Sequence, residues 1–131
     1  MWKVQLSVLM AGGLGLASLA QAAPCRPDQL LKRIGSAQTG SAVVRTGGAE
    51  VRLLSMTCDS NSACQAGVYD GDELSDTTNA DHVIEPGAAA NTSVLVPQGG
   101  YFDPPLSFNT GIVFIDSGNV AAISFFECQQ R

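Results

Sequence analysis

Four cysteines constrain the fold of this chain more than any other feature of its sequence. Cys58 and Cys64 enclose a short polar turn, residues 59–63, whereas Cys25 and Cys128 lie far apart along the chain. Four cysteines allow three pairings. We expect a Cys58–Cys64 disulfide to close the turn between two apolar runs and a Cys25–Cys128 disulfide to tie the two ends of the chain together.

A zinc site is the alternative use of these cysteines. Zinc sites favour closely spaced ligand pairs such as C-x-x-C, which the sequence lacks, and His82 is its only histidine. Disulfides are therefore the preferred prediction. Because disulfides persist in oxidising compartments, we predict a secreted or periplasmic protein.

The first 22 residues have the layout of a secretory signal peptide. Lys3 supplies a positive charge, an uncharged stretch with an apolar centre follows from residue 4, and Ala20-Gln21-Ala22 is typical of a cleavage site. An uncleaved membrane anchor is the alternative, but a spanning helix needs about 20 predominantly apolar residues and this stretch is interrupted by glycines and polar residues. We expect cleavage to leave one domain, residues 23–131, without membrane contact.

Charge is distributed unevenly along this mature chain. The seven Lys and Arg minus Lys3 leave six basic residues against twelve acidic ones, a net charge of −6. All basic residues except Arg131 lie at or before Arg52, and most carboxylates follow it. An acidic surface repels phosphate, which argues against a nucleic-acid partner. The opposite charges of the two parts suit head-to-tail association, although acidity by itself indicates only solubility.

Short apolar runs separated by turn residues predict an all-β fold. Residues 28–34 suit a single helical turn or an extended arm. Strands are expected at residues 41–45, 50–57, 65–69, 82–85, 92–96 and 106–108. Strands at this spacing indicate a single antiparallel β-sandwich of jelly-roll-like form.

The clearest predicted unit comes last in the chain. Residues 111–116 and 120–127 are rich in β-forming residues and flank Ser117-Gly118-Asn119, a pattern typical of an antiparallel hairpin. The run from Ile112 to Ile115 is apolar at every position. It therefore predicts a central strand that is covered on both faces.

The acidic segment from Asp70 to Asp76 is the candidate metal site. Carboxylates on Asp70, Asp72 and Asp76 suit calcium, which exported proteins encounter outside the cell. The segment does not follow the EF-hand template, because Ser75 stands where that loop requires glycine. An irregular calcium site and a solvated turn both remain open. No other cofactor is predicted.

Catalytic patterns are absent from the sequence. It contains no G-x-S-x-G motif, no nucleophile signal accompanies His82, and the thiols are expected to be oxidised. A carboxylate pair for glycoside hydrolysis stays open from sequence alone. Tyr69, Tyr101 and Phe102 are candidate sugar contacts, although core packing is the ordinary role of such residues. We predict that the protein is not an enzyme.

Three short motifs follow one another in the second half of the chain. They are Val68-Tyr69-Asp70-Gly71, the stretch from Tyr101 to Ile112 that contains Leu-Ser-Phe-Asn-Thr-Gly-Ile, and Asp-Ser-Gly-Asn-Val-Ala-Ala-Ile-Ser-Phe-Phe at 116–126. Their order resembles the small β-sandwich modules of tailed-phage virions, in head-decoration and tail-accessory proteins. The resemblance covers about residues 41–127. It implies a multimeric structural role without catalytic residues, while the signal peptide and the disulfides depart from that family.

These observations predict an exported, disulfide-stabilised, non-enzymatic structural or interaction module. It would self-assemble or decorate a larger surface, virion-like or cellular, so its partner is a protein or a second copy of itself. The alternative is a calcium- or carbohydrate-binding β-sandwich module that uses the loop from Asp70 to Asp76.

Overall fold

The computed structural model describes residues 24–131, and this part of the chain forms an all-β structure. No helix in the described range is long and apolar enough to cross a membrane. The predicted signal peptide, residues 1–22, lies outside the described residues and stays a prediction. The elements are, in chain order, β1 (Gln29–Arg33), β2 (Ala42–Thr46), β3 (Ala49–Val51), β4 (Leu53–Cys58), β5 (Cys64–Asp70), the 3-10 turn η1 (Asn79–Asp81), β6 (His82–Ile84), β7 (Gly87–Ala88), β8 (Ser93–Val96), β9 (Leu106–Phe108), β10 (Gly111–Gly118) and β11 (Val120–Gln130).

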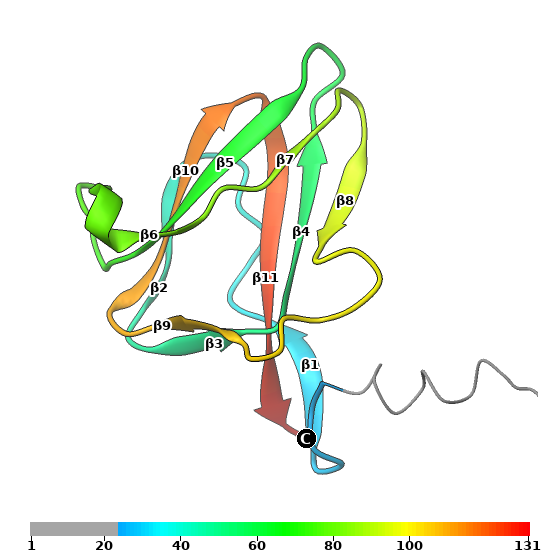
Figure 1. Cartoon of the computed structure of the whole chain (residues 1–131), viewed down its shortest axis with the longest axis vertical. Helices are drawn as coiled ribbons and strands as arrows, with labels where there is room; N and C mark the ends of the chain where they lie inside the picture. Colours follow the sequence, from blue (N-terminus) through cyan, green and yellow to red (C-terminus); the bar gives the residue numbers. More distant parts are fainter. Residues whose placement is uncertain (1–23) are drawn as a thin grey trace, which may run out of the picture.

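The strands pair as the two arms of one long hairpin. β1 pairs with β11, β2 with β10, β3 with β9 and β4 with β8, while β5 pairs with β6 and β7 where the hairpin closes. This hairpin is folded on itself, because β10 also pairs with β5 and β11 with β4. The result is two larger antiparallel sheets, β1-β11-β4-β8 and β2-β10-β5-β6, and the small β3–β9 pair (Figure 1).

One apolar core receives side chains from both larger sheets. Alternate residues of each strand point into it, as the two-residue period of a β-strand requires. The innermost side chains are almost fully buried; they are Leu54, Met56, Ile123 and Phe125 from one sheet and Ala66, Val68, Ile112 and Phe114 from the other. Burial of each large apolar side chain contributes about 1.5–3 kcal/mol, so this shared core holds the two sheets together.

The predicted hairpin of residues 111–127 is wrong. β10 lies between β2 and β5, and β11 lies between β1 and β4, so the intervening turn carries the chain from one sheet to the other. Gly118 and Asn119 make this crossing with φ values of 155° and 63°. The local pattern misleads because distant strands occupy both edges of β10 and of β11. The expectation of a central strand covered on both faces is confirmed, since Ile112, Val113 and Phe114 are fully buried.

The structure also differs from the sequence prediction at residues 50–57, and it decides between the two forms expected for residues 28–34. The strand predicted at residues 50–57 is interrupted at Arg52, whose N–H donates to the Phe126 carbonyl and whose carbonyl accepts the Phe102 N–H. β3 therefore leaves the direction of β4 and pairs with β9. The stretch at residues 28–34 is extended, because β1 forms along the edge of β11.

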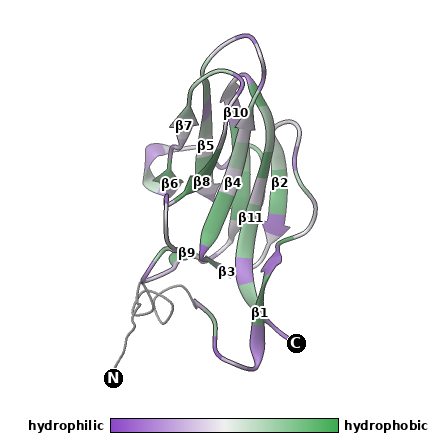
Figure 2. Ribbon diagram, turned by 90° about the vertical axis from the view of Figure 1, so that its right-hand side faces the viewer, coloured by the Kyte–Doolittle hydropathy of each residue, from purple (hydrophilic) through white to green (hydrophobic). Residues whose placement is uncertain are grey.

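Both predicted disulfides are present. The β4–β5 connection and the end of β11, which they tie, lie at opposite ends of the molecule (Figure 1). Cys25–Cys128 joins the segment before β1 to β11, with 5.5 Å between the Cα atoms. Cys58–Cys64 joins the end of β4 to the start of β5, with 5.3 Å between the Cα atoms. Figure 2 shows that hydrophilic residues mark β1 at the first end, whereas β4 is largely hydrophobic.

Candidate functional site

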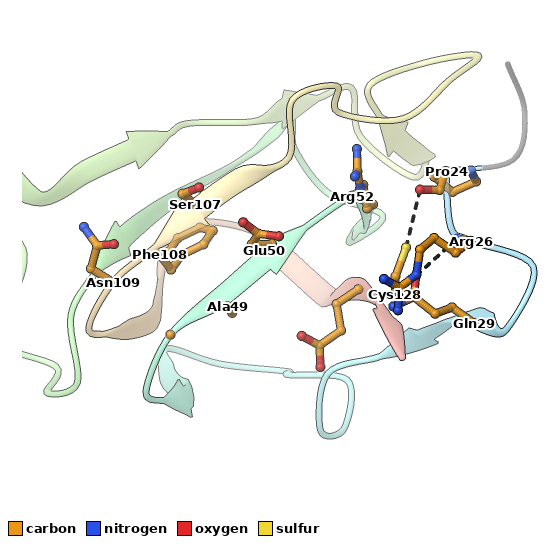
Figure 3. Close-up of a pocket in the computed structure, with 12 residues that line it drawn as sticks. Pro24, Arg26, Gln29, Ala49, Glu50, Arg52, Ser107, Phe108, Asn109 and Cys128 are labelled. Atoms are coloured by element: carbon orange, nitrogen blue, oxygen red, sulfur yellow. Dashed lines mark hydrogen bonds between the residues drawn. The ribbon is translucent and has the colours of Figure 1, made fainter. Parts of the chain in front are cut away.

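A polar cleft of about 600 Å³ opens beside the β3–β9 pair (Figure 3). Its wall is completed by β1, by the end of β11 and by the segment before β1. Ala49 and Phe108 line the cleft as well, but they are only 8% and 2% exposed. The charged and amide side chains that line the cleft are Arg26, Gln29, Glu50, Arg52, Asn109 and Glu127.

Glu127 is held in the wall of this cleft by an ion pair between the two sheets. A guanidinium nitrogen of Arg45 donates to both carboxylate oxygens of Glu127 at 2.7 Å. Arg45 faces inward because the β2–β10 register shifts between Ile112 and Val113, which places Arg45 opposite the buried Ile112. The Glu127 side chain is 13% exposed. This carboxylate therefore serves chiefly to join β2 to β11.

Arg26, Glu50 and Arg52 present the charges that a ligand can reach. The Arg52 guanidinium donates to the Phe102 carbonyl at 3.0 Å and lies 3.7 Å from the Asp103 carboxylate. Asp103 is 91% exposed, so water screens this pair and leaves it weak. Glu50 is exposed between the two buried residues of β3. The cleft thus offers a cationic hydrogen-bond donor, Arg52, and an anionic acceptor, Glu50, two residues apart in the chain.

Asp70, the first predicted calcium ligand, anchors the turn between β9 and β10. Its carboxylate accepts the N–H groups of Asn109, Thr110 and Gly111 at 3.0, 2.8 and 3.3 Å. Burial of Asp70 works against its charged form, but the three N–H donors outweigh burial and hold the pKa of this carboxyl below its ordinary value. A side chain at Gly111 would meet the carbonyl oxygens of Arg45 and Gly71, so the turn must pass close to β2.

Asp76 also acts on the backbone rather than toward Asp70. One carboxylate oxygen of Asp76 accepts the N–H groups of Asp72 and Glu73 at 3.0 and 3.1 Å. Asp72 is exposed. Within residues 24–131, no three metal-ligating side chains gather at one point. Calcium binding by Asp70, Asp72 and Asp76 stays a prediction, and the observed role of two of these carboxylates is to shape the loop.

The aromatic and histidine candidates lie at two places. Tyr69 and His82 pack edge to face on β5 and β6, with ring centroids 5.2 Å apart, and the Tyr69 ring lies over Gly67. Tyr101 and Phe102 are partly buried in the connection to β9, where the Phe102 backbone holds Arg52. Of these residues, Phe102 is the one that supports the cleft.

The residues of the cleft were not predicted from the sequence. They come from four separate segments, residues 24–29, 48–52, 107–109 and 127–128, and no segment contains more than four of them. The one local signal is the alternation around Val51, where the charged Glu50 and Arg52 flank a fully buried residue. That alternation predicts that Glu50 and Arg52 are exposed, but it does not predict which other segments lie beside them in the cleft.

Comparisons of the chain with family models, with curated proteins and with solved structures found no match. Its function is therefore inferred from the geometry of the cleft and from the distribution of charge.

Proposed function

We propose that this protein is an exported, non-enzymatic interaction module, a single jelly-roll-like β-sandwich that self-assembles or decorates a larger surface. The nested strand pairing supports the jelly-roll assignment, because such a fold is a long hairpin wrapped into two sheets. The two disulfides are compatible with an oxidising compartment outside the cytosol. The resemblance to small virion modules points to the same structural class of function.

The observation that carries the proposal is the cleft beside β3 and β9. It combines a cation, Arg52, with an anion, Glu50, and the apolar residues Pro24 and Ala49 are among the others that line it. Protein interfaces use such mixtures, in which polar groups set orientation around an apolar centre. A sugar is less well served, because Phe108 is buried and presents no open ring face for stacking. The surface that the module decorates is therefore proposed to be protein.

Binding is favoured over catalysis because the candidate catalytic side chains already make structural contacts. Glu127 is taken up by Arg45, and Asp70 by three backbone N–H groups. His82 packs on Tyr69, away from the residues that line the cleft. A general base needs to lie within hydrogen-bond reach of its nucleophile, and these groups are committed to structure instead.

Two measurements on the oxidised mature protein test the proposal. Sedimentation velocity over a range of concentrations reports self-association, and co-sedimentation with envelope fragments of the producing cells reports attachment to a surface. We expect at least one to be positive. Retention on the fragments should fall when Glu50→Arg reverses a charge in the cleft. The matched control is Glu85→Arg, which makes the same change at an exposed carboxylate elsewhere.

A protein that stays monomeric at every concentration and is not retained by the fragments contradicts the proposal. Equal retention of the two variants would show that the surface contact lies outside the cleft.

A further inference from the structure

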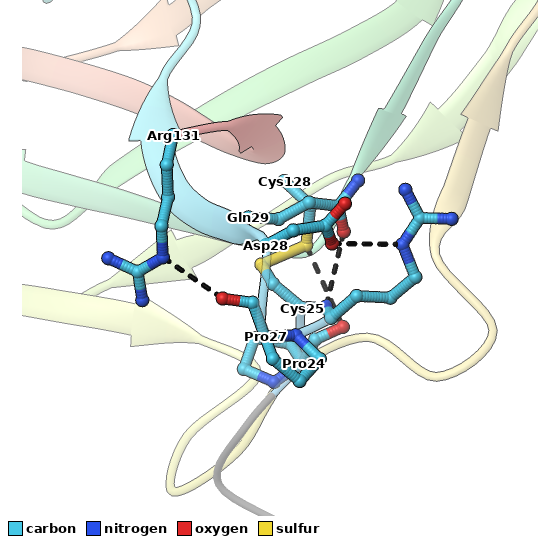
Figure 4. A network of polar contacts seen from close by, with 8 residues as sticks. Pro24, Cys25, Pro27, Asp28, Gln29, Cys128 and Arg131 are labelled. Atoms are coloured by element: carbon cyan, nitrogen blue, oxygen red, sulfur yellow. Dashed lines mark hydrogen bonds and ion pairs between the residues drawn. A yellow bond between two sulfur atoms is a disulfide. The ribbon is translucent and has the colours of Figure 1, made fainter.

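A second hollow, of about 310 Å³, lies at one end of the molecule, and we call it the terminal hollow. Figure 4 shows the Cys25–Cys128 disulfide and the polar contacts at this end. The walls of the terminal hollow are largely apolar, and two arginines, Arg26 and Arg131, are among the residues that line it. Leu30 on β1 is 37% exposed beside it. The residues that form it are Pro24, Cys25, Arg26, Pro27, Gln29, Leu30, Leu31 and Arg131.

The terminal hollow is a built feature of the chain ends. The Arg131 guanidinium donates to the Pro27 carbonyl at 3.0 Å, and the Arg131 N–H donates to the Asp28 carbonyl at 3.1 Å. Asp28 also lies 3.4 Å from the Arg26 guanidinium, but both side chains are more than half exposed, so this pair is weak. The two arginines therefore keep positive charge available beside an apolar surface.

The chain itself carries a segment with complementary chemistry. Leu74 is 49% exposed, and three carboxylates lie within two residues of it, on Asp72, Glu73 and Asp76. The bonds from Asp76 to the backbone of Asp72 and Glu73 hold this loop in one shape. We call residues 72–76 the Leu74 loop. An apolar side chain among carboxylates matches a largely apolar hollow that two arginines line.

The Leu74 loop cannot reach the terminal hollow of its own molecule. The loop leads from β5 to β6, and β6 is the edge of one sheet, whereas β1 is the edge of the other. Figures 1 and 2 both place β1 and the η1 region on opposite sides of the molecule. A contact between these two surfaces must therefore join separate molecules.

We propose that the Leu74 loop of one molecule docks into the terminal hollow of a second copy of this chain. The proposal rests on the interaction role proposed above and names the partner. The mature chain has twelve acidic and six basic residues, so most orientations of two copies are repulsive. This orientation brings Asp72 and Glu73 to the arginines, which favours it over the others. Because the two surfaces differ, the contact repeats head to tail.

Sedimentation velocity on the oxidised mature protein tests the contact. We expect wild-type protein to form species larger than a dimer as its concentration rises. Leu74→Ser should weaken this association about tenfold, because a leucine side chain is no longer buried. Leu95→Ser is the matched control, since Leu95 is 51% exposed on β8, away from both surfaces, and should associate like the wild type. Both substitutions are at exposed positions, and thermal unfolding verifies that each variant folds.

Mixing two variants gives the sharper test. Leu74→Ser keeps a working terminal hollow, and Arg131→Glu keeps a working Leu74 loop. Each alone should be mostly monomeric. Their equimolar mixture should form a one-to-one dimer and stop there, because only one working contact is available.

Three results would overturn the proposed contact. They are equal association of the Leu74 and Leu95 variants, no dimer in the mixture, and a wild-type protein that is monomeric. A monomer that still binds envelope fragments overturns only the head-to-tail contact and leaves the proposed interaction role standing.

Discussion

The two disulfides close opposite ends of the molecule in different ways. Cys58 and Cys64 are 3% and 4% exposed and belong to the apolar core, within a turn whose ends are 6 residues apart. Cys25 and Cys128 are partly exposed and 103 residues apart, and Cys128 lines the cleft while Cys25 lines the terminal hollow. The first bridge thus joins β4 to β5, two consecutive strands that belong to different sheets, inside the core. The second bridge shapes a surface as well as constraining the chain.

The two bridges should therefore differ in whether they affect binding as well as stability. Closing a long loop removes more freedom from the unfolded chain than closing a short one. The Cys25–Cys128 bridge also positions residues 24–28 against β11, where Arg26 lines both the cleft and the terminal hollow. Loss of the Cys25–Cys128 bridge should therefore lower both stability and association. Loss of the Cys58–Cys64 bridge should lower stability alone.

The largest expected effect is that of Cys25→Ala/Cys128→Ala. On the chain-entropy estimate, opening a loop of about 100 residues lowers the free energy of unfolding by about 4.7 kcal/mol. Urea denaturation of variant and wild type measures the difference. We also expect head-to-tail association to be lost, because the terminal hollow is no longer held. A loss of less than about 2 kcal/mol would mean that the β1–β11 pairing holds the chain end without the bridge.

Cys58→Ala/Cys64→Ala should lower the free energy of unfolding by about half as much, roughly 2.4 kcal/mol, because its loop is short. Association should remain at the wild-type level, measured by the same sedimentation experiment. If this variant loses more free energy of unfolding than Cys25→Ala/Cys128→Ala does, the packing of the two sulfur atoms in the core outweighs loop entropy. The Cys58–Cys64 bridge would then be the more stabilising of the two.

The ion pair between Arg45 and Glu127 supports the end that carries the cleft. Glu127→Gln leaves the Arg45 guanidinium without its carboxylate and should lower the free energy of unfolding by about 2 kcal/mol. Thermal or urea unfolding measures this loss. The double variant Arg45→Met/Glu127→Met should lose less free energy of unfolding than Arg45→Met and Glu127→Met lose together, because it leaves no charge unpaired. Strict additivity in this cycle would show that the two side chains do not interact.

The smallest expected effect concerns Asp70, which holds a turn by hydrogen bonds alone. Its pKa is lowered in the folded state, so its contribution is complete above the ordinary carboxyl pKa of about 4 and is lost as the pH falls through the lower folded value. Asp70→Asn should cost about 1 kcal/mol at neutral pH. The difference between variant and wild type should shrink below about pH 4, as followed by urea denaturation. A difference that is constant from pH 7 to pH 2 contradicts this role.

Local patterns in the sequence predicted most strands and both disulfides. The two-residue alternation and the Gly, Pro and Asn turns mark where strands begin and end, since these signals lie within a few residues of one another. The interruption at Arg52 leaves no such local signal, because its cause is hydrogen bonding to Phe102 and Phe126, far along the chain. The hairpin predicted at residues 111–127 was wrong for the same reason, as distant strands take both edges of β10 and β11.

The sequence by itself determined the β-class of the fold and the uneven charge along the chain, and the structure decided among the three possible pairings of the cysteines. Only the tertiary structure decided which strands are neighbours, and therefore which side chains meet at the cleft and at the terminal hollow. Strand pairing depends on which apolar faces can be buried together, and that is a property of the whole chain rather than of any one segment. The Leu74 loop and the terminal hollow lie on separate surfaces because β6 and β1 are the edges of different sheets.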